Sequence, residues 1–348
     1  MYHDREEFEV FAYSLISIKE DEIQQKIASD CDVFRDISSM SSGQAAQQIH
    51  SDGLDVLIDL GGYTTYTKPE ILALHPAPVQ CQFMGNPGTM EAKFIEYVIA
   101  DRHLISGEME EMSSQKFVFL PCAFVASISE SEEIEKSRSD FGLPDDAFVY
   151  CCFNFPTKFE PVIFKCWMEI LQLVPESVLW LFCENQSGIE NLKKAARNCG
   201  ISEKRLFFTP KIPYKDYLAL FKLANVFLDT HHYNAGSTAI DALRMSLPII
   251  TFPGKTYTSR MCMSILNALG LEELVCNDTS HYIQLAVELA ADSEKLSDIN
   301  SKIANARFGS VGVFNVENFT QNLEKGIKRV VLNYREEKPP ESIVSCQA

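Results

Sequence analysis

The sequence is poor in positive charge. It holds 31 Lys and Arg residues against 48 Asp and Glu residues, which gives a formal net charge of -17 over 348 residues. A protein that binds nucleic acid through the phosphates needs a basic surface, so this composition argues against nucleic-acid partners. An anionic ligand would need local positive charge at its own site, against the field of the whole protein.

Long apolar runs are lacking as well. No stretch reaches the roughly 20 apolar residues of a membrane-spanning helix, and no basic amphipathic stretch indicates binding to a membrane surface. Residues 1–7 have neither the basic start nor the apolar core of a secretory signal. We therefore expect a soluble protein with no membrane partner.

The cysteines form no CxxC pair. Eleven are present, and several, such as Cys151 and Cys152, lie in apolar stretches. Buried, reduced thiols in a reducing compartment are the expectation from this pattern. A cytoplasmic or nuclear location follows.

The chain is long enough for two domains. Hydrophobic residues make up 46% of it and charged residues 23%, a composition that favours a sizeable core over disorder. Short β-rich runs alternate with helical patterns, which predicts an α/β fold with parallel sheets covered by helices. The expected strands are 8–15, 56–60, 79–84, 97–100, 117–120, 148–153, 178–182, 205–208, 226–228 and 248–252. The expected helices are 42–50, 68–74, 189–199, 215–223, 237–245 and 316–333, with two more starting near Pro161 and Ser259.

A seam at 126–140 divides these elements. It is rich in Ser and Glu and has little apolar content, as is typical of a domain boundary. We expect an N-terminal lobe over 1–130 and a C-terminal lobe over 141–334. The charged, proline-bearing segment 335–348 is predicted to be a disordered tail.

The segment 228–243 has the pattern of a phosphate site. A strand ends near Leu228, a loop of small residues follows, and a helix opens at Ser237 or Thr238. The start of a helix offers unpaired N–H groups and the positive end of the helix dipole, and small residues such as Gly236 admit a phosphate. Asp241, one helical turn later, is placed to bind a ribose or to cap the helix. An ordinary capped helix in an α/β fold explains the same residues.

A second candidate follows the strand 148–153. Ligands of open α/β sheets bind outside the carboxyl ends of the strands, where Asn154 and Lys158 lie. Lys158 is the kind of cation that stabilises a leaving diphosphate. A solvated surface lysine explains the position equally.

Two loops of the first half form the third candidate. Each follows a strand, so both are expected to face the cleft between the lobes, and their glycines permit tight turns and close backbone approach. Turn chemistry alone is the simpler explanation. His50 and Asp55 flank the strand 56–60 and are weak candidates for a base. The loop residues concerned are Gly62, Tyr63, Gly85, Pro87, Gly88 and Thr89.

Taken together, the motifs resemble the catalytic region of the O-linked N-acetylglucosamine transferases, a family that includes the SPINDLY-type O-fucosyltransferases. The resemblance extends from about Phe8 to Asn333, and several ordered motifs at consistent spacing carry it. They are Gly61-Gly62-Tyr63-Thr64, His75-Pro76-Ala77-Pro78-Val79-Gln80, Gly85-Asn86-Pro87-Gly88-Thr89, Phe153-Asn154-Phe155-Pro156-Thr157-Lys158, Leu228-Asp229-Thr230, Asn234-Ala235-Gly236-Ser237-Thr238, Asp241-Ala242-Leu243, Pro253-Gly254 and Ser259-Arg260.

The resemblance implies a GT-B fold of two Rossmann-like lobes with the donor on the second. It implies transfer of a sugar from a nucleotide diphosphate donor to Ser or Thr hydroxyls of proteins, with inversion and without a metal or other cofactor. UDP-N-acetylglucosamine is the first expectation for the donor and GDP-fucose the second. By the same resemblance Lys158 contacts the diphosphate, Ser237 and Thr238 hold phosphate, and Asp241 binds the ribose.

The chain departs from the family pattern at several positions. Nothing aligns with the first strand and histidine-bearing loop of relatives, so the first lobe looks truncated at its N-terminus, and the tetratricopeptide partner region is absent from this chain. Gly236, Phe155 and Tyr217 stand where the animal enzymes have His, Gln and His. Two alternatives stay open: a catalytically inactive relative that binds nucleotide or partners, and a GT-B transferase with a non-protein acceptor.

Overall fold

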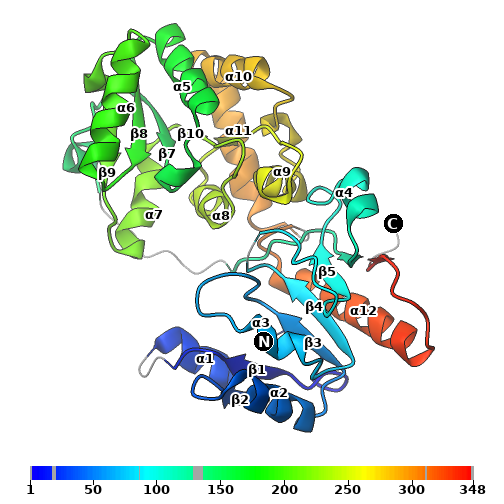
Figure 1. The fold of residues 1–348 in the computed structure, drawn as a ribbon. Coiled ribbons are helices and arrows are strands. Elements are labelled where there is room, and N and C mark those ends of the chain that lie inside the picture. The colour runs from blue at the N-terminus through cyan, green and yellow to red at the C-terminus, as the bar shows by residue number, and fades with distance from the viewer. Residues whose placement is uncertain (1, 18–20, 86, 128–135, 310–311, 346–348) are drawn as a thin grey trace. The chain divides into compact units, whose positions relative to one another are not determined.

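The computed structural model describes residues 2–17, 21–85, 87–127, 136–309 and 312–345. The chain forms two compact units. Unit 1 combines Met1–Ala123 with Val316–Ala348, and unit 2 is Phe124–Asn315. Both are built from parallel strands and helices (Figure 1), as the alternating sequence pattern predicts.

Unit 1 contains two parallel sheets. One has the order β1-β2, and the other has the order β12-β6-β5-β4-β3. The strands are β1 (Phe11–Ser14), β2 (Val33–Asp36), β3 (Val56–Asp59), β4 (Val79–Phe83), β5 (Tyr97–Ala100), β6 (Lys116–Phe119) and β12 (Ile343–Val344). The helices are α1 (Glu22–Asp30), α2 (Ser42–Ser51), α3 (Pro69–Ala73), α4 (Gly107–Met112) and α12 (Val316–Arg335).

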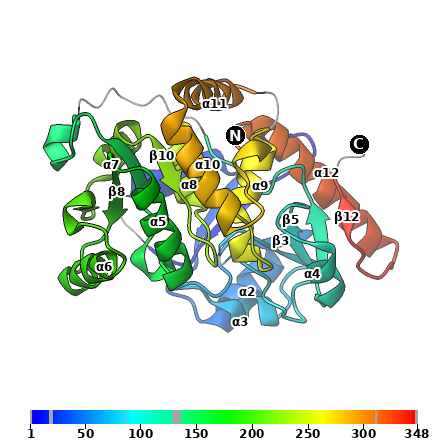
Figure 2. The ribbon, with the colours of Figure 1, turned by 90° about the horizontal axis from the view of Figure 1, so that it is seen from above.

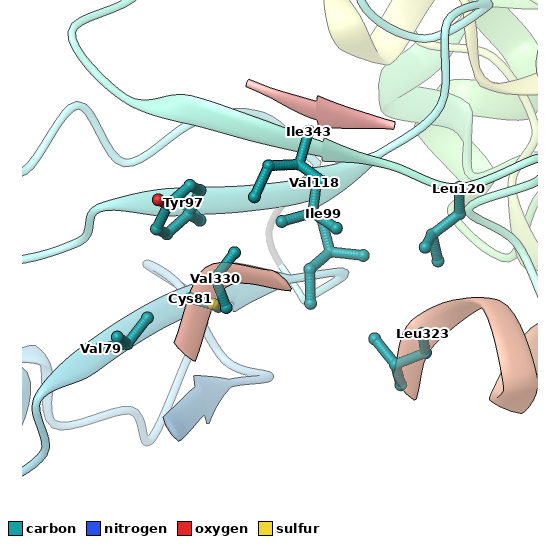
Figure 3. Packing of buried hydrophobic residues seen from close by; sticks show 9 residues of the cluster. All are labelled: Val79, Cys81, Tyr97, Ile99, Val118, Leu120, Leu323, Val330 and Ile343. Atoms are coloured by element: carbon teal, nitrogen blue, oxygen red, sulfur yellow. The ribbon is translucent and has the colours of Figure 1, made fainter. Parts of the chain in front are cut away.

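The core of unit 1 lies between its larger sheet and α12. Alternate residues of β4 and β5, such as Cys81 and Ile99, meet the apolar stripe of α12 formed by Leu323 and Val330 (Figure 3). Ile343 of β12 packs into the same hydrophobic cluster. β5 reads as a continuous apolar run, as expected of a strand that is covered on both faces, whereas β4 alternates apolar residues with the buried Gln80 and Gln82.

Unit 2 is one parallel sheet of order β11-β10-β7-β8-β9 with helices around it. In Figures 1 and 2, α5 and α10 lie side by side against it. The strands are β7 (Phe148–Cys152), β8 (Ser177–Phe182), β9 (Leu206–Thr209), β10 (Val226–Leu228) and β11 (Ile249–Ile250). The α-helices are α5 (Pro161–Leu173), α6 (Gln186–Asn198), α7 (Tyr214–Leu223), α8 (Ser237–Arg244), α9 (Met261–Ala268), α10 (Thr279–Ala291) and α11 (Ser293–Ala306). Short 3-10 turns lie at Arg138–Phe141, Pro156–Lys158, Glu203–Arg205, Tyr257–Ser259 and Glu272–Leu274.

The C-terminal part of the chain differs from the predicted domains. α12 belongs to unit 1 and not to the second lobe, because its apolar face continues the core of β4 and β5. The predicted disordered tail contains β12, where buried Ile343 pairs with Val118. The chain therefore returns to its first unit at the end. The predicted seam 126–140 falls partly outside the described residues.

Several elements were not predicted. They include α1, α4, β2 and the pair α10 and α11. The helix expected near Ser259 is a 3-10 turn followed by α9. No helix in the described ranges has the length and apolar content needed to cross a membrane.

Candidate functional site

The sheet of unit 2 reverses its strand order between β7 and β10. From β7 the chain builds outward through β8 and β9, and it then returns to add β10 and β11 on the other side. The loops that leave the two central strands therefore separate at their carboxyl ends. This switch point is where open α/β sheets bind ligands. It holds Asn154 and Lys158 after β7, and the loop 229–236 after β10.

The carboxylate of Asp229 holds the two loops together. Its Oδ1 accepts hydrogen bonds from Asn154 Nδ2 (3.0 Å) and from the N–H groups of Thr230 and Ala235 (both 2.8 Å). Its Oδ2 accepts from Thr251 Oγ1 at 2.8 Å. Asp229 is only 1% exposed, and burial raises its pKa, while these donors and the charge of Lys158 act in the opposite direction. The loop is thereby fixed at both of its ends.

Lys158 projects from the β7 loop onto the β10 loop. It ends the turn Pro156–Lys158, and its Nζ donates a hydrogen bond to the Asn234 carbonyl at 2.9 Å. The same Nζ lies 3.8 Å from the centroid of the Tyr233 ring. Burial lowers the pKa of Lys158, and the nearby Asp229 and Cys152 oppose that shift. A partly desolvated cation thus stands beside the loop that leads into α8.

The start of α8 has no side-chain cap. Gly236 is its N-cap residue, and a Cβ there would meet Met261 Cε at 3.4 Å. The first N–H groups of a helix have no partner within it, so Ser237 and Thr238 present donors and the positive end of the helix dipole. Ser237 is exposed and Thr238 half-buried. Together with Lys158 these groups form a site suited to an anion such as a diphosphate.

Asp241 is engaged by neighbours that sequence reasoning missed. Its Oδ1 accepts a hydrogen bond from the Tyr214 hydroxyl at 2.7 Å and lies 3.7 Å from Arg244 Nη1. Burial raises the pKa of Asp241, and the hydrogen bond from Tyr214 and the charge of Arg244 lower it. The residue as a whole is 9% exposed. A ribose hydroxyl would therefore share this carboxylate with Tyr214.

The two glycine loops of unit 1 touch each other. Asp59 at the end of β3 accepts from the N–H groups of Gly61 (3.1 Å) and Gly62 (2.7 Å). Gly85 has φ +63°, and a Cβ there would lie 2.5 Å from the Leu60 carbonyl oxygen. Only glycine permits this approach, so the pairing of the loops explains one glycine that the sequence analysis assigned to turn chemistry or to a ligand.

The other residues of these loops form local bonds. The Tyr63 hydroxyl donates to the Met90 carbonyl at 3.2 Å. The Gly88 carbonyl accepts from Gln82 Nε2 at 2.9 Å, and Thr89 Oγ1 donates to Glu91 at 2.9 Å. Pro87 stands half-buried between the two glycines. Asn86 lies outside the described residues.

His50 and Asp55 are not brought to these loops. His50 is exposed in the last turn of α2, and Asp55 precedes β3. Asp55 pairs there with Arg335 of α12 at 3.1 Å. The glycine loop 61–64 follows β3 at its opposite end. The strand β3 therefore separates both candidates for a base from this glycine loop, and their role as a base stays a prediction.

The sequence gives little indication of three residues that contact the candidate site residues, namely Asp229, Tyr214 and Tyr233. The sequence presents Asp229 as part of the Leu228-Asp229-Thr230 motif, and an acid directly after an apolar strand is a recognisable feature. Tyr214 and Tyr233 carried no signal, because their partners Asp241 and Lys158 are distant in the sequence. Among the residues that the structure describes, no group of three His, Cys, Asp or Glu side chains is arranged for a metal ion.

Comparison with known proteins gives a family match. The family model described as glycosyl transferase family 41 matches residues 1–131 and 127–323. A protein of Arabidopsis thaliana named as a probable UDP-N-acetylglucosamine–peptide N-acetylglucosaminyltransferase, SEC, is 34% identical over 331 residues. That match covers 93% of this chain and 34% of the relative. A UDP-N-acetylglucosamine–peptide N-acetylglucosaminyltransferase of Caenorhabditis elegans is 26% identical, with 99% of this chain and 40% of the relative covered.

Solved structures share the fold. A mutant O-GlcNAc transferase of Thermobaculum terrenum matches with a TM-score of 0.87 and 25% identity, over 97% of this chain and 64% of that one. A protein of Anabaena, solved with UDP and glucose, matches with a TM-score of 0.59 and 12% identity, over 92% of this chain and 91% of that one. These likenesses confirm the predicted GT-B type of fold. The chain spans 34–40% of the length of the two curated relatives described above.

Proposed function

Because the chain belongs to glycosyl transferase family 41, we propose that it transfers a sugar from a nucleotide diphosphate donor to Ser or Thr hydroxyls of proteins. UDP-N-acetylglucosamine is the donor that the names of the relatives favour. The observation that carries the proposal is the position of Lys158. Its Nζ is bonded to Asn234 in the loop that opens α8, at the switch point of the sheet. A desolvated cation and a helix start therefore converge where a diphosphate would bind.

The role of these groups follows from the charge that develops in the reaction. An acceptor hydroxyl attacks the anomeric carbon, the bond from that carbon to the diphosphate breaks, and its electron pair leaves with the nucleotide. The configuration inverts, and the hydroxyl proton passes to a base that we leave unassigned. Lys158 and the N–H groups at Ser237 and Thr238 stabilise the leaving diphosphate without a metal or other cofactor, because its negative charge grows in the transition state.

The remaining donor contacts follow the same geometry. Asn154 keeps the β7 loop against Asp229, and Gly236, which has no side chain at the N-cap of α8, admits the phosphates at the helix start. Asp241 accepts a ribose hydroxyl beside Tyr214. In unit 1, the paired loops that contain Gly62, Tyr63, Gly85, Pro87, Gly88 and Thr89 belong to the acceptor side. A cytoplasmic or nuclear location completes the proposal.

A transfer assay tests this function. The full chain is incubated with a Ser- and Thr-rich peptide and either UDP-N-acetylglucosamine or GDP-fucose, without added metal, and the peptide is examined by mass spectrometry. We expect the mass of one N-acetylhexosamine to be added, and this product to be lost in Lys158→Ala. Lys165→Ala is the control, because Lys165 is exposed on the neighbouring α5. Addition of the mass of a fucose to the peptide would identify GDP-fucose as the donor. Saturable UDP binding without transfer would reduce the function to nucleotide binding.

A further inference from the structure

We infer that Tyr233 is a positioning residue, whose ring face holds the Lys158 ammonium against the β10 loop in the orientation that a diphosphate requires. The inference rests on the proposed function, because it assigns Lys158 to the leaving group. It adds a residue that the motifs of the sequence do not single out. The ring belongs to the same loop as Asn234, which accepts the hydrogen bond of Lys158.

The contact is short and partly shielded from water. Lys158 Nζ lies 3.8 Å from the centroid of the Tyr233 ring, well inside the range of a cation–π interaction. Tyr233 is 38% exposed, and burial also raises the pKa of its hydroxyl. Because the cation is itself partly desolvated, the attraction to the ring is stronger than it would be on an open surface.

The backbone on both sides of Tyr233 is fixed. Its carbonyl accepts a hydrogen bond from Thr230 Oγ1 at 2.6 Å. The N–H of Asn234 donates to the Thr258 carbonyl at 2.9 Å, and Thr258 Oγ1 donates to the His232 carbonyl at 3.1 Å. A tyrosine side chain has only two rotatable bonds. With the backbone fixed, only these two torsions stay open to the ring before a ligand binds, which lowers the entropy cost of ordering Lys158.

The ring also acts on the charge of Lys158. Burial favours the neutral amine, and the Asp229 carboxyl after β10 is the main group that opposes this shift in the pKa of Lys158. The Asp229 carboxylate already accepts hydrogen bonds from four donors, which reduces its effect on Lys158. The negative face of the Tyr233 ring adds to the groups that favour the ammonium. A diphosphate needs this protonated form.

The Tyr233 ring also affects how the remaining N–H groups of the Lys158 ammonium meet a ligand. An ammonium has three N–H groups, and Lys158 gives one of them to the Asn234 carbonyl. With the ring occupying one side of Nζ, rotation about the side chain is restricted. The ammonium is therefore presented to a ligand in a single orientation and not as a freely moving charge.

A graded substitution tests the inference without changing the shape of the site. Tyr233 is replaced by Phe and then by phenylalanines that carry one, two and three ring fluorines, which weaken the negative ring face stepwise. The probe is UDP, and its dissociation constant is measured by calorimetry for each full-length variant. We expect Phe to bind nearly as the parent does. Across the fluorinated series the constant should rise stepwise, by about five- to tenfold in total.

A second readout follows Lys158 directly. In protein labelled at the lysine side chains, the NMR signal that disappears in Lys158→Met is titrated with pH in the absence of nucleotide. Each added fluorine should lower the pH at which this signal titrates. A ring that merely fills space would leave this titration and the UDP constant unchanged across the series. The same substitutions at Tyr334, an exposed residue near the end of α12, are the control and should alter neither.

The outcomes separate the inference from the function on which it rests. A parent protein that binds neither UDP nor GDP would contradict the proposed function. A second outcome would overturn the role of Tyr233 alone. In it, UDP binding depends on Lys158, but neither the UDP dissociation constant nor the Lys158 titration changes across the fluorinated series. A stepwise change in both readouts supports it.

Discussion

Asn154 Nδ2 donates a hydrogen bond to Asp229 Oδ1 at 3.0 Å, and this contact joins the loops that leave β7 and β10. The two residues are distant in the sequence, yet they meet because parallel strands end at the same edge of a sheet. Asp229 also orders the loop that carries Tyr233 and Asn234, through the N–H groups of Thr230 and Ala235. The proposed donor site is therefore built around a buried carboxylate that itself has no proposed contact with the donor.

Asp229→Asn tests this support. The amide nitrogen replaces one acceptor oxygen, so a buried donor loses its partner, at a cost of about 1–3 kcal/mol in the free energy of unfolding. We expect a lower unfolding midpoint in urea and weaker UDP binding in the protein that remains folded. Asp146→Asn, at an exposed position before β7, is the control. Unchanged stability in Asp229→Asn would contradict the central role of this carboxylate.

Thr238→Val tests the start of α8. The substitution keeps the shape of the side chain and removes a hydroxyl that the proposal places on phosphate. Loss of a hydrogen bond to a charged group costs about 1.5 kcal/mol or more, which corresponds to a roughly tenfold higher dissociation constant for UDP. Thr279→Val, at the start of α10, provides a matched control. Equal affinities of parent and Thr238→Val in calorimetry would remove Thr238 from the phosphate site.

Gly85→Ala tests the contact between the glycine loops of unit 1. Gly85 has φ +63°, and a Cβ would lie 2.5 Å from the Leu60 carbonyl oxygen. Backbone must move to relieve this clash, so we expect a loss of about 1–3 kcal/mol in stability, measured by urea unfolding. Gly43→Ala is the control, because it lies in α2 with nothing within 4 Å of its added Cβ. There alanine should stabilise the protein slightly. Equal unfolding midpoints for the two variants would refute the clash.

Asp52 gives a prediction on pH. The hydrogen bond from Arg35 is the largest of the effects that hold the pKa of Asp52 below the ordinary value of 3.8, and Tyr13 and Gln48 add further bonds. A lowered pKa in the folded state means that the ion contributes stability above the unfolded pKa and loses it as the pH falls through the folded pKa. Asp52→Asn should therefore destabilise the protein at neutral pH, and the difference in urea midpoint should shrink below about pH 4. A difference that stays constant with pH would exclude the charge of Asp52 as its cause.

Local patterns were sufficient to predict many of the strands and helices. Apolar runs such as 178–182 and 226–228 predict buried strands because parallel sheets are covered on both faces, and β8 and β10 lie there. The helix 237–245 was predicted from its small residues and hydroxyls, and α8 begins at Ser237. Motifs and helix starts are local in sequence, so they can be recognised without coordinates.

Tertiary contacts were not predictable in this way. The return of α12 to unit 1 depends on which core its apolar stripe meets, and the stripe itself carries no such information. The same holds for Tyr214 on Asp241 and for Tyr233 on Lys158, since each pair joins different elements. His50 and Asp55 lie before β3 and not at the end that leads into the glycine loop, because closeness to a strand in sequence does not say which end of the strand a residue occupies.

The central claim is that Lys158 at the switch point of unit 2 binds the diphosphate of a nucleotide sugar. Calorimetric titration of the full chain with UDP, without added metal, tests it most directly when Lys158→Ala and the control Lys165→Ala are measured beside the parent. The account predicts saturable binding to the parent and to Lys165→Ala, and loss of that binding in Lys158→Ala. Equal UDP affinity in all three proteins, or a parent that binds neither UDP nor GDP, would contradict it.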